Sequence, residues 1–142
     1  QQPNLMRRVS EAMTAFYDAT VELGVADKVT AFTASDFGRT LSSNGDGSDH
    51  GWGSHHFMVG GAVKGRAFYG KAPPVSITNT ADANDQWHVG QGRLLPSTSV
   101  DQYAAILATW FGVSNTELAG VLPNLSHFGG ADYPTDLGFM AA

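Results

Sequence analysis

The chain has 142 residues and a formal net charge of −5; 42% of its residues are hydrophobic and 15% are charged. This length is enough for a buried core, and the lack of a basic stripe argues against nucleic acid as a partner. No apolar run reaches the length of a membrane span, and the lack of cysteine excludes disulfides and thiolate metal sites.

The N-terminal part of the sequence predicts a helix followed by a strand. Apolar residues recur at spacings of three and four from Leu5 to Leu23, which indicates an amphipathic helix over 4–23. Residues 28–34 are rich in β-branched and aromatic side chains and predict a strand buried on both faces, as in a parallel sheet. Because a helix, a short turn and a strand form half of an α/β unit, we expect an α/β fold.

The middle of the sequence predicts one more strand between two loops. Residues 41–53 are polar and dense in glycine, so they predict a flexible loop. Residues 56–60 are apolar again and predict a second core strand. Residues 71–97 are rich in proline and small polar side chains and predict a long irregular loop.

Two capping signatures organise the C-terminal part. A serine is followed three residues later by glutamine or glutamate at two places, so we expect helices over 99–111 and 115–121. The tail over 124–142 contains a glycine pair and a proline, and predicts a loop that frays or packs as an arm.

Asp36 and His50 are the first candidates for a functional site. Asp36 follows the first predicted strand and His50 ends the glycine-rich loop, which places both at strand ends on the same side of the sheet. Ligands gather there in open α/β sheets. Asp36 also fits a simple turn cap, and His50 an ordinary loop histidine. Asp49 would orient the His50 imidazole if that ring binds a metal.

Four further side chains have two interpretations each. His55, next to the second strand, either faces the same site or makes structural hydrogen bonds. Arg39 begins an expected helical turn and suits either a phosphate, sulfate or carboxylate group or a surface ion pair. Trp52, between two glycines, suits a substrate platform or a plug for the loop. Arg93 either reaches the same face or pairs with a loop acid.

Four segments in this order resemble a known bacterial family, the domain of unknown function 1501. They are Phe-Thr-Ala-Ser-Asp-Phe-Gly-Arg-Thr, Asp-His-Gly-Trp-Gly, Met-Val-Gly-Gly-Ala-Val-Lys-Gly and Gly-Arg-Leu-Leu-Pro-Ser-Thr-Ser-Val-Asp-Gln-Tyr-Ala-Ala. Members are exported to the periplasm or beyond, and are similar in fold to alkaline phosphatases and sulfatases. The resemblance implies that residues 1–142 are one C-terminal segment of an alkaline-phosphatase-like sandwich, with mostly parallel strands flanked by helices. It also implies that an N-terminal half, or another chain, covers the sheet.

The resemblance further implies a metal site. Asp36 and His50 match ligand positions of the wider superfamily, for zinc, manganese or calcium, with a small anionic ester as substrate. Phe37 stands where the superfamily has a histidine ligand, and phenylalanine cannot coordinate a metal. The nucleophile would lie upstream of this chain. Two functions follow: an exported metal-dependent hydrolase of phosphate or sulfate esters, or an inactive exported binding or assembly module on the same scaffold.

Overall fold

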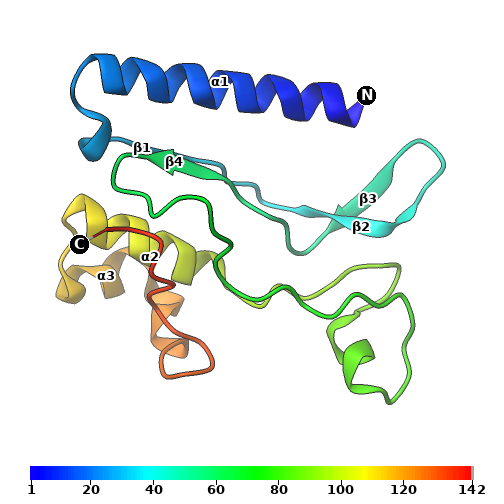
Figure 1. Ribbon diagram of the computed structural model, residues 1–142. Coiled ribbons are helices and arrows are strands. Elements are labelled where there is room, and N and C mark those ends of the chain that lie inside the picture. Colours follow the sequence, from blue (N-terminus) through cyan, green and yellow to red (C-terminus); the bar gives the residue numbers. More distant parts are fainter. Residues whose placement is uncertain (142) are drawn as a thin grey trace. The chain divides into compact units, whose positions relative to one another are not determined.

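The computed structural model describes residues 1–141, which form a mixed α/β chain with helices and small antiparallel sheets (Figure 1). The chain divides into two compact units. The first unit combines residues 1–33 and 56–67 with the segment that begins at Gly138, and the second combines 34–55 with 68–137. Ala142 lies outside the described residues. The expectation that the whole sequence is one segment of a larger domain stays a prediction.

The first unit is built on one long helix and two short strands. Helix α1 (Gln2–Glu22) is followed by a 3-10 turn (Ala26–Lys28) and by β1 (Thr30–Phe32), close to the helix and strand expected there. Strand β4 (Met58–Gly60) pairs antiparallel with β1, so that Ala31 lies opposite Val59. Figure 1 shows α1 running alongside this pair of strands.

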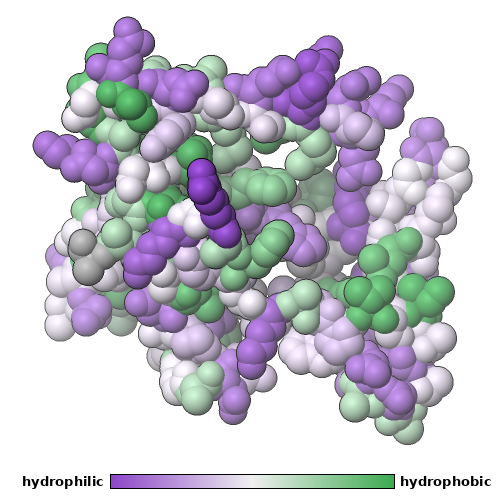
Figure 2. Space-filling view, in the orientation of Figure 1, coloured by the Kyte–Doolittle hydropathy of each residue, from purple (hydrophilic) through white to green (hydrophobic). Residues whose placement is uncertain are grey.

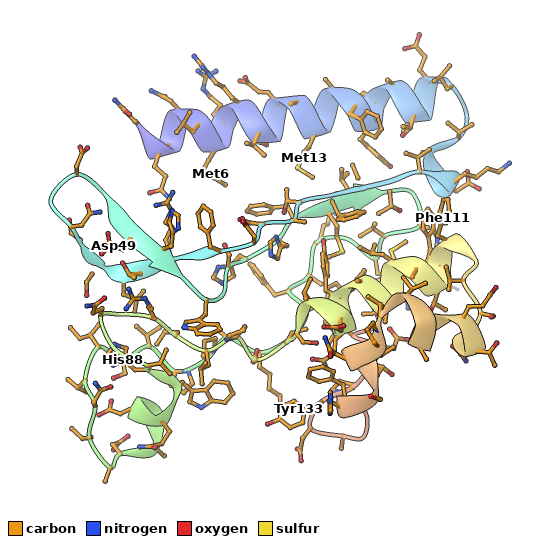
Figure 3. The ribbon with its side chains drawn as sticks, turned by 180° about the vertical axis from the view of Figure 1, so that it is seen from behind. Met6, Met13, Asp49, His88, Phe111 and Tyr133 are labelled. Atoms are coloured by element: carbon orange, nitrogen blue, oxygen red, sulfur yellow. The ribbon has the colours of Figure 1, made fainter. Side chains whose placement is uncertain are left out.

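One face of α1 makes an apolar hollow with the segment around β4. Met6 and Met13 project from α1 toward the same side (Figure 3) and line this hollow together with Phe57 and Val59. The helix is otherwise poorly covered, because Thr20 is its one buried residue. Large apolar side chains are exposed in both units, and hydrophobic residues appear at the surface in several places in Figure 2.

The end of the described chain belongs to the core of the first unit. Phe139 is fully buried, and Met140 forms an antiparallel bridge with Val63. The Lys64 N–H donates to the Phe139 carbonyl at 2.9 Å, and the Ala141 N–H donates to the Ala62 carbonyl at 2.7 Å. This part of the tail therefore packs rather than frays.

The second unit contains a hairpin where the sequence predicts a loop. Strands β2 (Gly38–Ser43) and β3 (Ser48–Gly51) pair antiparallel, with Arg39 opposite His50 and a bulge before Ser43. The flexible loop expected over 41–53 and the helical turn expected at Arg39 are therefore wrong. The polar residues of this stretch build the turn: the Asn44 N–H donates to the Gly47 carbonyl at 3.1 Å, which closes the hairpin.

A helical cluster forms the other part of the second unit. Helix α2 (Val100–Phe111) ends at Gly112 in the left-handed region (φ 106°), and α3 (Asn115–Val121) and a 3-10 segment (Pro123–His127) follow. The core here comprises Ala105, Ile106 and Leu118. From Phe68 to α2 this unit is irregular except for a 3-10 segment (Ala83–Trp87) and an isolated antiparallel bridge between His88 and Leu94.

The expectation of mostly parallel strands is corrected by both sheets. Each has two strands, and each pair is antiparallel. Parallel neighbours need a crossover of a dozen or more residues, usually a helix. The chain between β1 and β4 contains the β2–β3 hairpin instead of a helix. The α/β character is thus confirmed, whereas a parallel-stranded sandwich is not what these residues form.

Candidate functional site

The β2–β3 hairpin holds most of the residues singled out by the sequence. Its strands approach closely at glycines: a Cβ on Gly38 would lie 1.6 Å from the Gly53 carbonyl oxygen, and one on Gly51 would lie 2.9 Å from the Arg39 carbonyl carbon. Glycine at these places lets the backbones meet where a side chain would collide. The many glycines of this stretch, which suggested a flexible loop, therefore allow the close packing of a hairpin.

Phe37, Arg39 and His50 lie together at the hairpin. The Phe37 ring stacks on the His50 imidazole, with 3.7 Å between ring centroids and 10° between ring planes. The Arg39 guanidinium carbon lies over the Phe37 ring, 5.3 Å from its centroid. Because Arg39 and His50 are cross-strand partners, their side chains share one face of the hairpin. The result is a cation–aromatic–imidazole cluster.

Two arginines are anchored to the backbone of β3. Arg39 Nη1 donates to the Ser48 carbonyl at 2.9 Å, and Arg93 Nε donates to the His50 carbonyl at 3.3 Å. Within residues 1–141 neither of these two arginines has a carboxylate at salt-bridge distance. From the sequence, an ion pair was one of two interpretations for each arginine. In the structure each one donates to a backbone carbonyl oxygen instead.

Asp49 is directed to other partners than the His50 ring. Its carboxylate accepts a hydrogen bond from Asn44 Nδ2 at 2.9 Å, and its N–H donates to Thr40 Oγ1 at 3.1 Å. Neighbouring residues of a strand point to opposite faces, so Asp49, labelled in Figure 3, faces away from the side that carries His50. The hydrogen bonds of Asp49 thus stabilise the hairpin.

Asp36, His55 and Trp52 are exposed. The turn at Asp36 is capped by a different side chain, since Ser35 Oγ accepts from the Phe37 N–H at 3.4 Å. Asp36 is therefore open to solvent beside the Phe37–His50 stack. Trp52 is 65% exposed, which fits a platform better than a plug.

Asp36 and His50 carry groups that could act as metal ligands. Asp36 is exposed, and stacking on Phe37 covers a face of the His50 ring while its nitrogens lie at the ring edge. Both groups are ordinary ligands for divalent metals. Residues 1–141 bring together no group of three His, Cys, Asp or Glu side chains that could hold an ion. An ion held by Asp36 and His50 would need further ligands from elsewhere.

Two buried polar residues were not singled out by the sequence. The Asp85 carboxylate accepts hydrogen bonds from the hydroxyls of Ser76, Thr78 (2.8 Å) and Thr80 (2.5 Å) and from the Thr80 N–H (3.0 Å). These bonds, led by that of Ser76, hold the pKa of Asp85 well below its usual range. His88 (Figure 3) is buried, and its Nε2 accepts from the Gly92 N–H at 2.7 Å. Together they order the 76–93 segment that carries Arg93.

The fold and the cluster define a mixed α/β protein with an arginine- and histidine-bearing hairpin surface. The chain belongs to the family described as "Protein of unknown function (DUF1501)", which matches residues 1–116. Searches of curated proteins and of solved structures return no match. No helix within the described part of the chain is long and apolar enough to cross a membrane.

Proposed function

We propose that this chain supplies part of the site of a metal-dependent hydrolase that acts on phosphate or sulfate esters. The observation that carries the proposal is the placement of Arg39 and His50 on one face of the hairpin, next to exposed Asp36. In this proposal Arg39 binds the anionic group of the substrate. A guanidinium suits that role because its planar set of donors matches tetrahedral oxyanions.

Asp36 and His50 are the residues that would hold a divalent metal ion, whether zinc, manganese or calcium. A bound ion supplies Lewis-acid stabilisation of the charge on the transferring group. Phe37 fixes the plane of the His50 ring by stacking, and so restricts the directions in which its nitrogens point. The nucleophile and the remaining ligands are contributed, in this proposal, by the N-terminal half of a longer protein or by another chain. Export is part of the proposal and follows from the family resemblance alone.

A non-enzymatic module is the second candidate, and Phe37 favours it. An aromatic ring occupies the position where the phosphatase-like superfamily has a histidine. This ring stacks on His50 and lies under the Arg39 guanidinium group. Such a cluster binds anions without a metal. In that case the protein acts as an exported binding or assembly module.

Metal content and hydrolysis together separate the two candidates. The protein is prepared at its natural length, its metals are measured by elemental analysis, and p-nitrophenyl phosphate and p-nitrophenyl sulfate are offered as substrates. For a hydrolase we expect a stoichiometric metal ion and turnover, both lost in His50→Ala and kept in the control His127→Ala, a second exposed histidine. A folded, metal-free protein inactive on both esters would support the module.

Arg39→Gln tests the anion-binding role. Glutamine can still donate to the Ser48 carbonyl, so the hairpin should persist. We expect kcat/KM to fall by at least about tenfold, equivalent to about 1.4 kcal/mol, with unchanged metal content. Unchanged kcat/KM would remove Arg39 from the site.

A further inference from the structure

We infer that Arg93 and Arg39 together form a two-guanidinium site on β3 for one tetrahedral anionic group, the phosphate or sulfate group of an ester. This inference rests on the proposed function and extends it, because it names a second residue that binds the anionic group. The sequence places Arg93 more than 40 residues beyond His50, and only the fold brings the two together.

The two anchoring bonds set the arrangement. Arg39 and Arg93 donate to the carbonyl oxygens of Ser48 and His50, which lie two residues apart in β3. A strand rises about 3.3 Å per residue, so the carbonyl oxygens of Ser48 and His50 are about 7 Å apart along β3. Guanidinium groups anchored at this spacing are near enough for one tetrahedral anion to accept charge-assisted hydrogen bonds of about 2.8 Å from both, which is the arrangement that we infer.

Most of the donor capacity of both guanidinium groups remains for a ligand. A guanidinium has five N–H donors, and one on each arginine is used for its backbone anchor. The chain has 13 acidic and 8 basic residues, yet neither Arg39 nor Arg93 has a carboxylate at salt-bridge distance within residues 1–141. Acids are thus abundant, but none neutralises these two arginines.

Arg93 is held in place by its own loop. The Gly92 carbonyl accepts from the Leu41 N–H of β2 at 2.8 Å, and the Gly92 N–H donates to buried His88. Gly92 has φ +74°, and a Cβ there would lie 2.8 Å from the backbone nitrogen of Ser42. The Arg93 N–H also donates to the Gly90 carbonyl at 3.0 Å. An arginine on such a fixed backbone loses less freedom when it binds an anion.

Anion titration tests the inference without requiring catalysis. Sodium phosphate and sodium sulfate are titrated calorimetrically into the full chain, with sodium chloride at matched ionic strength as reference. We expect Arg93→Gln to weaken phosphate binding roughly tenfold and Arg39→Gln to do the same, since each removes a charge-assisted pair. Arg93→Lys keeps the positive charge but loses the planar set of donors, so its phosphate affinity should lie between those of the wild type and Arg93→Gln. Arg8→Gln on α1 is the charge-matched control and should bind like the wild type.

The outcomes separate this inference from the proposed function. If the wild type binds phosphate no more tightly than the Arg39→Gln/Arg93→Gln double variant, or if Arg93→Gln binds like Arg8→Gln, the two-arginine site is wrong. If Arg93→Gln keeps both its turnover and its phosphate affinity, the hydrolase proposal is retained and Arg93 is not part of the anion site. Arginine-dependent binding without turnover leaves the two-arginine site standing and removes the hydrolase. Circular dichroism of each variant shows that the chain is folded.

Discussion

The Phe37 ring lies almost parallel to the His50 imidazole, with their centroids 3.7 Å apart. In the metal site proposed above, Phe37 stands where the resemblance to the phosphatase-like superfamily implies a second histidine. At this centroid distance the two rings lie nearly face to face, so each covers one face of the other. Phe37 therefore stabilises the orientation of the His50 imidazole, and in the proposed metal site it does so in place of a second ligand.

Phe37→His should create a stronger metal site. It adds an imidazole next to Asp36 and His50, and three ligands hold a divalent ion far better than two. We expect zinc affinity to rise by roughly tenfold or more, measured by competition with a chromogenic chelator. Phe37→Leu adds no ligand and should bind zinc as the wild type does. Equal zinc affinity in Phe37→His and Phe37→Leu would show that Asp36 and His50 do not point toward a common ion.

Local signals made the helices predictable. The Ser99–Gln102 pair predicts the start of α2, and the structure has both reciprocal bonds, Gln102 N to Ser99 Oγ at 3.1 Å and Ser99 N to Gln102 Oε1 at 2.9 Å. Capping and apolar periodicity act within one or two turns, so a short stretch of sequence contains them.

The hairpin and the contact of Arg93 with His50 depend on pairings between residues that are distant in the sequence, which a local pattern does not contain. Residues 38–51 lack the apolar alternation of a strand, and their pairing depends on the close approach of Gly38 to Gly53 and on turn bonds at Asn44. Arg93 reaches His50 because the Gly92 carbonyl pairs with β2. Such contacts between distant residues are decided by the whole unit, which is why the predicted loop and parallel strands were wrong.

Gly92→Ala and Gly90→Ala should lower the free energy of unfolding by different amounts. Both glycines have positive φ, +74° and +95°, and alanine there costs about 1–2 kcal/mol of backbone strain. A Cβ on Gly92 would also collide with the β2 backbone, whereas nothing lies within 4 Å of one on Gly90. We therefore expect Gly92→Ala to lower the free energy of unfolding more than Gly90→Ala does, as measured by urea denaturation. Equal losses would mean that the loop can move away from β2.

Acid should destabilise the 76–88 segment through Asp85. The Ser76, Thr80 and Thr78 hydroxyls hold its pKa low in the folded state, so below about 3.8 the unfolded chain takes up the proton first. The stability due to Asp85 is thus complete above this pH and decreases as the pH falls toward the folded-state pKa. Asp85→Asn should melt at a lower temperature than the wild type at neutral pH, and the difference should narrow in acid. A difference in melting temperature between the wild type and Asp85→Asn that stays constant across this pH range would contradict the assignment. Asp18→Asn on α1 serves as the exposed control.

The two capping boxes predict unequal losses of stability. Gln102 is 1% exposed, and its Nε2 also donates to the Pro134 carbonyl at 2.6 Å. Gln102→Ala leaves both this carbonyl and the Ser99 N–H without their partner, and should cost about 1–3 kcal/mol. Glu117, the corresponding residue of α3, is exposed, so water replaces its bond to Ser114 in Glu117→Ala and the loss should be smaller. Chemical denaturation of the two variants measures the difference, and a larger loss for Glu117→Ala would overturn this ranking.

Phe139 should be one of the most sensitive positions of the first unit, although the sequence places it in a tail. Its side chain is fully buried, and its carbonyl accepts from the Lys64 N–H. Phe139→Ala removes a large buried ring and leaves a cavity, which costs about 3–5 kcal/mol. Phe68→Ala is the matched control, because Phe68 is fully exposed and its truncation should change stability by less than about 0.5 kcal/mol. Thermal unfolding followed by circular dichroism compares the two. A Phe139→Ala variant as stable as Phe68→Ala would show that the end of the described chain does not belong to this core.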